Sequence, residues 1–594
     1  MKKILLSITL LLLSATSVFA VRAKQGICQL QLVDGTIVSA TLHGDENFHY
    51  YTLLDGTPLQ ESNVKGKYEK ITEAILQDKQ TAALARMQQA ATTTGTDGVS
   101  RASSIGSYTP AYFPHAGSPK ALVILVQFQD VKFKSTNPVA TFNHYLNSPM
   151  GETMPEADKN VFSQKEKHIN YGSVKQYFTD MSHGKFTPQF DIVGPVTVSQ
   201  ESSYYGANLN GDDGKYVEMM TEACKLVDDQ VNFADYNSNG DNYVDLVYFI
   251  YAGYSESVSG NSSDCLWPKS GTNNIGTFDG KRVSRFGINN ELNGTPEDLV
   301  DGKYLINGIG LFCHEFSHTM GVPDLYPTSG SAANANNQSP EYWDLMDMGE
   351  YTQNGYYPTP YSPWEKSIMG WIEPITLSNT EPSQIELEPY HLNSKALKIN
   401  ADNDDASVKY GEYLLLQNIV NEGWAKYLPG YGMLVWRIDY ADKAYVKMGD
   451  YPNNTKGKPR VMVVPADGML LNSANCGEGA PYSTAEYTES LENDPFPTYK
   501  KGSATEYEVN SLTSIQLNHS TLTTRPLYNI TKNEETGMVT FDYLKDFSAG
   551  TGIRGIQMEN DIRPTEYFDM EGRKVMHPQK GHLYITNKGK KIIF

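Results

Sequence analysis

Cysteine is scarce in this chain, with five residues among 594. So few cysteines, in an odd number, exclude a small scaffold held together by disulfides. Positive charge is also in deficit, and the formal net charge of −20 argues against nucleic acid as a partner. Beyond the first residues no apolar run is long enough to cross a membrane, and we find no strong repeat or coiled-coil pattern. The length predicts three to five folded units, at about 150 residues per domain.

The first twenty residues have the features of an export signal. Lys2 and Lys3 form a basic start, a short apolar run follows from Ile4 to Leu13, and small residues end at Ala20. We therefore expect residues 1–20 to be a signal peptide and the protein to be secreted. A membrane anchor is the alternative, and it is disfavoured because the apolar run is too short.

Residues 21–104 have the layout of a propeptide with a linker. A strand-like region covers 27–59, and Glu73 to Ala91 are rich in helix-forming residues. The stretch from Thr92 to Arg101 then breaks the pattern and predicts an exposed linker. A folded segment and a linker before an enzyme are typical of a zymogen, with Arg101 as a candidate cleavage site.

The middle of the chain mixes strands and helices, whereas the later part is rich in strands. Ala121 to Phe128 predict a buried strand, and Ser173 to Met181 predict a helix capped by Ser173. Leu246 to Tyr251 predict another buried strand. Beyond Trp371, short alternating strands predict a sandwich-like module that extends to about residue 544. The fold class is therefore α+β.

The stretch from Cys313 to Asp324 carries the strongest chemical signal. On a helix, His314 and His318 lie one turn apart on the same face, where two imidazoles can bind one Zn²⁺. Glu315 is adjacent and can reach a water molecule on the metal, which is the position of a general base. The alternative is a buried helix with two satisfied histidines, and it is disfavoured because three polar side chains on an apolar helix are costly without a metal.

The residues after this helix predict the third ligand. Gly321 tolerates positive φ and Pro323 opposes helical angles before it, so the chain is expected to turn back and present Asp324. Three protein ligands leave a fourth position open, as catalytic zinc requires. A glutamate is the alternative third ligand, with Glu341 and Glu350 as candidates.

Four downstream residues are candidates for supporting roles. Met346, in the sequence Trp343-Asp344-Leu345-Met346, fits a methionine-containing turn beneath the metal, with Met348 as the alternative. Ordinary core packing explains such methionines equally well. Tyr351 and Tyr356 are candidate hydrogen-bond donors to the developing oxyanion.

A second cation site is predicted just before the strand at Leu246. Oxygen-bearing side chains alternate around Gly240 and suggest a calcium loop, although Leu246 stands where an EF-hand has its bidentate glutamate. An Asx-rich turn without metal is the alternative. The candidate calcium ligands are Asp235, Asn237, Asn239, Asp241 and Asp245.

These motifs resemble those of the M6 peptidases, the secreted zinc metalloproteases similar to immune inhibitor A. The resemblance rests on HEFSHTMGVPDLY, on WDLM with the following SPWEKSIMGW, and on DYNSNGDNYVDLVYFIYAG, and it covers about 105–545. It implies zinc ligands at His314, His318 and Asp324, the catalytic glutamate at Glu315 and the turn methionine at Met346. The implied fold is zincin-like or metzincin-like, with a twisted sheet over the active-site helix.

The resemblance also implies an organisation and a function. We expect a propeptide at 21–104, a catalytic domain at 105–374, a β-rich domain at 375–546, and a segment at 547–594 similar to the C-terminal sorting segments of exported Bacteroidetes proteins. The implied function is a zinc-dependent endopeptidase that acts on extracellular proteins or peptides. It would be secreted or displayed on the surface of a Gram-negative bacterium, with its own propeptide and the secretion machinery as partners. A surface adhesin or inactive binding module is the alternative.

Overall fold

The computed structural model describes most of the chain. The described residues are 17–24, 26–45, 48–93, 113–208, 213–327, 339–401, 412–439 and 452–548, without 474–475, 478–479, 502–505, 516 and 519–524, together with short stretches between 567 and 593. The expected export run and the candidate cleavage site Arg101 therefore lie outside the described residues. No helix among those described has the length and apolar character needed to cross a membrane.

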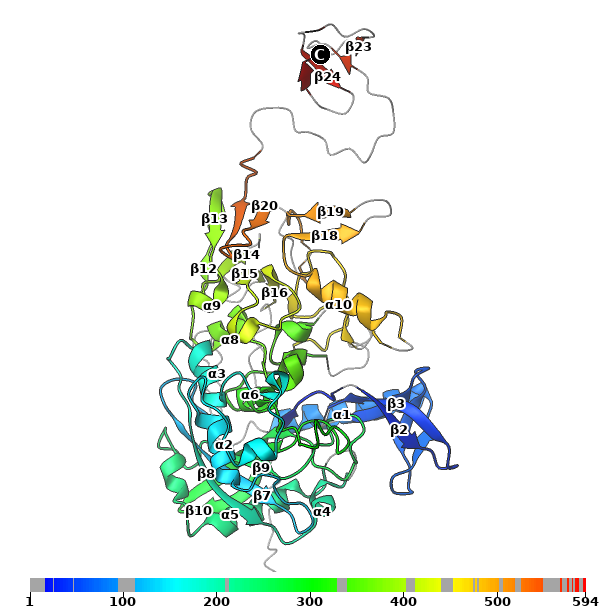
Figure 1. Ribbon diagram of the computed structural model, residues 1–594, viewed down its shortest axis with the longest axis vertical. Helices are drawn as coiled ribbons and strands as arrows, with labels where there is room; N and C mark the ends of the chain where they lie inside the picture. Colours follow the sequence, from blue (N-terminus) through cyan, green and yellow to red (C-terminus); the bar gives the residue numbers. More distant parts are fainter. Residues whose placement is uncertain are drawn as a thin grey trace, which may run out of the picture.

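A six-stranded mixed sheet forms the centre of the part that carries the histidine motif (Figure 1). The strands β7, β8, β9 and β11 run parallel to one another, and β10 and β1 add antiparallel strands at one edge. In spatial order they are β1 (Ser17–Ala20), β10 (Lys269–Phe278), β11 (Lys281–Asn290), β9 (Val247–Tyr251), β7 (Lys120–Gln127) and β8 (Gln189–Thr197). The predicted strands at 121–128 and 246–251 are confirmed as β7 and β9.

Helices cover both faces of this sheet. Because side chains alternate along a strand, Ala121, Val123 and Leu125 of β7 pack into one core, and the residues between them pack into another. The first core contains α6 and α3, and the second contains α5. The helices are α2 (Pro138–Asn147), α3 (Val174–Met181), α4 (Ser202–Gly206), α5 (Tyr216–Val227), α6 (Ile309–Thr319) and α8 (Pro363–Ile368), with short 3-10 turns at η2 (Asp158–Asn160), η3 (Glu166–His168), η4 (Phe233–Tyr236), η5 (Glu341–Trp343) and η6 (Met348–Gly355).

Two features of the sequence fix the helices around the site. Ser173 caps α3 by accepting a hydrogen bond from the Gln176 amide at 3.1 Å, as the sequence predicts. On α6, the Phe312 ring stacks on Tyr248 of β9 with ring centroids 4.0 Å apart. The site helix is therefore held directly on the central sheet.

We expect Gly310→Ala to destabilise the protein by about 1–3 kcal/mol, the usual cost of overpacking. A Cβ atom at Gly310 would lie 2.1 Å from the carbonyl oxygen of Glu350, so α6 would have to move away from η6. Urea-induced unfolding measures the effect. Alanine in place of glycine within a helix ordinarily stabilises by roughly 1 kcal/mol, so a more stable variant would contradict this close approach.

The later part of the chain forms two sheets over a shared apolar core. Leu414 and Leu416 of β15 face that core, whereas Leu415 faces the core that contains α6. This region also contains short helices that the sequence did not predict. The first sheet has the order β12 (Ile375–Thr376), β14 (Leu397–Asn400), β15 (Tyr413–Ile419), β16 (Gly432–Ile438) and β17 (Val461–Val463); the second has β13 (Ser383–Leu387), β21 (Val539–Tyr543) and β20 (Leu527–Lys532); β18 (Thr498–Lys501) pairs with β19 (Glu506–Val509); and the helical segments are α9 (Tyr390–Asn393), η7 (Gly423–Ala425) and α10 (Thr484–Glu492).

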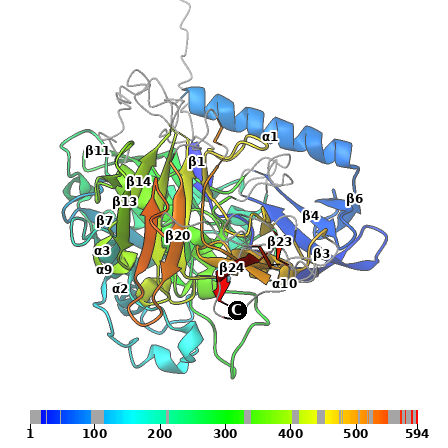
Figure 2. The ribbon, with the colours of Figure 1, turned by 90° about the horizontal axis from the view of Figure 1, so that it is seen from above.

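The N-terminal region is a small sheet followed by one long helix, which lies along the outer side of the molecule in Figure 2. Its core includes Leu42 and Leu59. Two residues from the central part of the chain, Trp267 and Leu311 of α6, belong to the same core. The elements are β2 (Ile27–Gln31), β3 (Ile37–Gly44), β4 (His49–Leu53), β5 (Pro58–Glu61), β6 (Tyr68–Lys70) and α1 (Glu73–Thr93), and a last small sheet contains β22 (Tyr567–Phe568), β23 (Lys574–Val575), β24 (Leu583–Thr586) and β25 (Lys591–Ile593).

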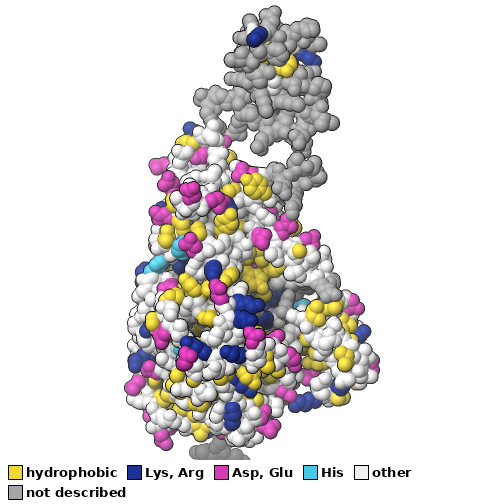
Figure 3. Space-filling model, viewed as in Figure 1, with side chains coloured by type: hydrophobic (Ala, Val, Ile, Leu, Met, Phe, Trp, Pro, Cys, Tyr) yellow, Lys and Arg dark blue, Asp and Glu magenta, His cyan; other side chains and the backbone are white. Residues whose placement is uncertain are grey.

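The cysteines form no disulfides, and the charged side chains are spread over the surface. All five cysteines are unpaired, and Cys28 is a buried member of the N-terminal core. Figure 3 shows acidic side chains spread over one face of the molecule, around Lys and Arg side chains near its middle.

Candidate metal and peptide-hydrolysis site

The helix α6 ends in the turn that the sequence predicts. Gly321 has φ of 95°, and its amide donates to the His318 carbonyl at 2.8 Å. The Val322 amide then donates to the Ser317 carbonyl at 3.2 Å. These bonds satisfy carbonyl groups that the end of a helix leaves without partners. The reversal brings Asp324 back beside the helix.

Three buried side-chain atoms meet at this turn. The Nε2 atoms of His314 and His318 lie 3.2 Å apart. Oδ1 of Asp324 lies 3.2 Å from the first and 3.3 Å from the second. All three side chains are at most 4% exposed. Among the described residues, these three side chains form a group that could hold a metal ion.

A hydrogen bond at Nδ1, the ring nitrogen that faces away from the triangle, fixes the tautomer of each imidazole. Nδ1 of His314 lies 3.0 Å from the Leu345 carbonyl, and Nδ1 of His318 lies 2.7 Å from the Val322 carbonyl. Because a carbonyl only accepts, each Nδ1 carries the proton and each Nε2 presents a lone pair. Two lone pairs and a carboxylate therefore face one another in a buried space, which is costly without a cation.

The size of this triangle fits a tetrahedral metal ion. Ligands about 2.0 Å from zinc stand about 3.3 Å from one another in a tetrahedron. The observed edges of 3.2–3.3 Å are those of one face of such a tetrahedron. In addition, no described residue donates a hydrogen bond to Asp324 Oδ1. The residues present thus suit zinc, with one further position free for water or substrate.

Glu315 lies beside these ligands and is fully buried. Burial raises the pKa of its carboxyl group to about 8, against the influence of nearby His318. Its Oε1 accepts a hydrogen bond of 2.9 Å from the Val21 amide, whereas Oε2 has no hydrogen-bond partner in the structure.

The segment that contains the predicted turn methionine, Met346, lies next to His314 and to the returning chain. Met346 is fully buried, and its carbonyl accepts from the Leu325 amide at 2.8 Å. The preceding carbonyl, of Leu345, is the one that orients His314. The Asp344 carboxylate accepts from the Met346 amide at 2.8 Å and so fixes the turn. Sequence reasoning missed the carbonyls of Leu345 and Val322, because backbone groups leave no signature in residue types.

The two glutamates that compete with Asp324 lie elsewhere. Glu350 Oε2 is 3.8 Å from Nδ1 of His314, on the side away from the other imidazole. Glu341 accepts from the Tyr487 hydroxyl at 2.7 Å and from the Ser473 amide at 3.3 Å. Neither glutamate completes the triangle that Asp324 forms.

The two candidate tyrosines differ in position. The Tyr356 hydroxyl donates to the Ile306 carbonyl at 2.7 Å, within the core. The Tyr351 hydroxyl donates to the carbonyl of Arg22 at 2.7 Å. Of the two, only Tyr351 therefore contacts the segment beginning at Val21, whose first amide donates to Glu315.

The predicted calcium loop gains no support from the structure. Its carboxylates instead face Arg285, which lies 3.3 Å from Asp241 and 3.8 Å from Asp245. Asn237 accepts from the Gly240 amide at 2.6 Å, and Asp245 accepts from the Ser238 amide at 2.7 Å. Arg285 and backbone amides thus contact several of the oxygens proposed to bind calcium. The remaining candidates, Asp235 and Asn239, accept from the Asn232 side chain and from the Asp241 amide.

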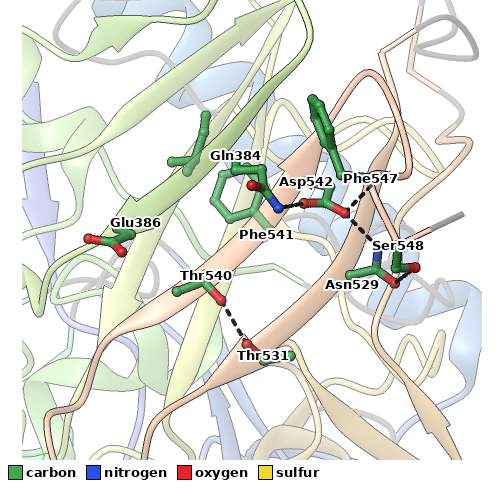
Figure 4. Close-up of a pocket in the computed structure, with 10 residues that line it drawn as sticks. Gln384, Glu386, Asn529, Thr531, Thr540, Phe541, Asp542, Phe547 and Ser548 are labelled. Carbon is green, nitrogen blue, oxygen red and sulfur yellow. Dashed lines mark hydrogen bonds between the residues drawn. The ribbon is translucent and has the colours of Figure 1, made fainter. Parts of the chain in front are cut away.

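A pocket of about 740 Å³ lies on the sheet of β13, β21 and β20, apart from the histidines (Figure 4). Its polar groups satisfy one another: Gln384 donates to Asp542 at 3.0 Å, and Thr531 and Thr540 share a hydrogen bond of 2.8 Å. It brings together no group of metal ligands among the described residues.

Comparison with known proteins agrees with a metal site at α6. Residues 112–371 match the model of the immune inhibitor A peptidase M6 catalytic domain. The pre-pro-metalloprotease PrtV of Vibrio cholerae serotype O1 is 27% identical over 243 residues, which cover 36% of this chain and 26% of PrtV. Immune inhibitor A of Bacillus thuringiensis subsp. alesti is 25% identical over 294 residues, or 43% of this chain and 40% of that protein. The chain thus spans between a quarter and two fifths of the length of these relatives, and its residues 112–371 are similar to the peptidase M6 domain of the immune inhibitor A type.

Proposed function

We propose that this protein is a secreted zinc-dependent endopeptidase that hydrolyses peptide bonds of extracellular proteins. The observation that carries the proposal is the buried triangle of His314, His318 and Asp324, whose edges match a tetrahedral ion and whose lone pairs converge. Its position inside the region similar to an M6 peptidase domain supports the same conclusion.

In this proposal His314, His318 and Asp324 hold zinc, which supplies the Lewis acidity that makes water acidic near neutral pH. Glu315 takes a proton from the attacking water and returns it to the leaving amine. The Leu345 and Val322 carbonyls keep both imidazoles in the tautomer that binds metal. The Met346 carbonyl accepts from the Leu325 amide and so holds the returning chain beside Asp324.

We also propose the organisation that the sequence predicts. It comprises a signal peptide at 1–20, a propeptide with linker at 21–104, a zincin-like catalytic domain at 105–374, a β-rich domain at 375–546 and a sorting segment at 547–594. Secretion, zymogen maturation and display at a Gram-negative cell surface belong to this proposal. The unpaired cysteines and the packed N-terminal sheet are compatible with it.

Removal of metal tests the proposed function. We expect a zinc chelator to abolish casein hydrolysis by the purified protein, and stoichiometric Zn²⁺ to restore it, because catalysis needs the open metal position. Metal content and hydrolysis are measured on the same sample. A processed sample that contains no zinc and still binds a cell surface would instead favour a binding module.

A further inference from the structure

The segment Val21–Lys24 passes through the candidate site as an extended chain. The strand before it, β1, pairs antiparallel with β10 at the edge of the central sheet, with Ala20 opposite Lys269. The strand β1 also packs near α6. Addition of a strand to a sheet edge is a common way for proteins to bind an extended peptide. Before the proposed removal of residues 1–20, the chain's own N-terminal segment therefore has the arrangement of a bound substrate.

Hydrogen bonds from the site hold the main chain of this segment. The Val21 amide donates to Glu315, and the Val21 carbonyl accepts from Nε1 of Trp267 at 3.1 Å. The Arg22 carbonyl accepts from the Tyr351 hydroxyl at 2.7 Å. The Lys24 amide donates to the Ser257 carbonyl at 2.7 Å. Because these bonds use backbone groups, peptides of other sequences can form them too.

The contact with Glu315 sets the register of the segment. A general base that returns its proton to the leaving amine must lie within hydrogen-bond distance of that nitrogen. The Val21 nitrogen is at this place, 2.9 Å from Glu315 Oε1. A substrate in the same register would be cut before the residue that replaces Val21, and Arg22 marks its second residue on the leaving side.

The Arg22 side chain enters a buried acidic pocket. Its guanidinium donates to the Ser473 hydroxyl at 2.8 Å and lies 3.8 Å from Asp347 Oδ1. Glu341 and Asp347 are both fully buried, and Asp347 Oδ1 has no hydrogen-bond partner in the structure. Burial lowers the pKa of Arg22, but attraction to Glu341 and Asp347 outweighs this, so the pKa is raised overall.

The pocket is built rather than incidental. Glu341 has φ of 52°, a conformation that costs energy for a residue with a side chain, and its amide donates to Asp347 at 2.8 Å. Its carboxylate is held by Tyr487 of α10 and by the Ser473 amide. Burial and Asp347 raise the pKa of Glu341 to about 7. Two carboxylates this close in a buried site favour a cation between them.

We infer that Glu341 and Asp347 form a subsite for an arginine side chain, two residues beyond the bond that is cut. This inference rests on the proposed function, because it names the substrates of that site as peptides with arginine at this position. A planar guanidinium suits two carboxylates and a hydroxyl better than the compact ammonium of lysine does.

The test uses the zinc-loaded chain from Val21 onward, as it stands after the proposed removal of residues 1–20. It carries Arg22→Gln, which weakens the binding of the chain's own residues 21–24 at the site. The probes are peptides of residues 17–26 that carry arginine, citrulline or lysine at the position of Arg22. Citrulline keeps the shape of arginine and lacks its charge. We expect the arginine peptide to bind and to be cleaved about tenfold or more better than the citrulline peptide, the scale for loss of a buried charge pair. Mass spectrometry should place the cut between Ala20 and Val21.

A second substitution in the same background gives the control. R22Q with Asp347→Asn should bring the arginine-to-citrulline ratio close to one. R22Q with Glu291→Gln removes a buried carboxylate that accepts from the Lys134 amide, outside this pocket, and should leave the ratio unchanged. Circular dichroism shows whether each variant folds, and the ratio in R22Q alone tests the inference even if the double variants do not.

Two failures are distinguishable. If casein and all three peptides resist cleavage with zinc present, the proposed function fails, and equilibrium binding of the peptides still tests the subsite. If the peptides are cleaved, or bound, equally well with arginine and citrulline, or if the cut falls elsewhere, the subsite is wrong while the peptidase remains.

Discussion

Replacement of Glu315 by glutamine is expected to lower kcat/KM for peptide hydrolysis by about 10²- to 10⁴-fold, the usual contribution of a general base. Glutamine fills the same volume, but it cannot accept a proton from water. The histidines and Asp324 are unchanged, so bound zinc should remain stoichiometric. Kinetics on a fluorogenic peptide and metal analysis on the same preparation make the measurement.

The matched control for this variant is Glu291→Gln, which also neutralises a fully buried carboxyl group in the same domain. Burial raises the pKa of Glu291 to about 7, so the two groups have similar surroundings. We expect the control to retain far more hydrolysis than E315Q. Comparable residual activity in both variants would remove the role assigned to Glu315.

Replacement of Asp324 by alanine is expected to lower zinc affinity steeply and to abolish hydrolysis. The variant keeps two imidazoles, which do not complete the three-ligand set of a catalytic zinc site. In the wild type, zinc at about 1,000 times its Kd should stabilise the fold by about 4 kcal/mol. Thermal unfolding with and without zinc should show this gain in the wild type and little of it in D324A.

Glu350→Gln separates the competing ligand sets. Glu350 lies 3.8 Å from Nδ1 of His314, on the side away from the triangle. We therefore expect E350Q to keep zinc and the zinc-dependent rise in Tm. Zinc binding that is retained in D324A and lost in E350Q would make the glutamate the third ligand.

The helix and the turn that carry the motif were accessible from sequence because their signals are local. Histidines four residues apart share a helix face whatever surrounds them, and Gly321 adopts the positive φ that a helix end requires. The cap at Ser173 and the buried strand β7 depend in the same way on neighbours in the chain. Such features follow from short-range sterics and hydrogen bonding.

The predicted calcium loop shows what residue types alone do not reveal. Alternating oxygens around Gly240 suit calcium, but Arg285 comes from a neighbouring strand and pairs with two of them. No spacing rule within the loop could reveal an arginine about forty residues away.

The amino-acid sequence by itself determined the chemistry that α6 can carry: two imidazoles on one face, a carboxylate beside them and a turn that returns Asp324. Only the tertiary structure decided which backbone carbonyls fix the imidazoles, and which charge neutralises Asp241 and Asp245. It alone also brought Arg22, Glu341 and Ser473 into one pocket. The reason is physical, since periodicity and capping act within a few residues, whereas contacts between distant segments are set by how the whole chain packs.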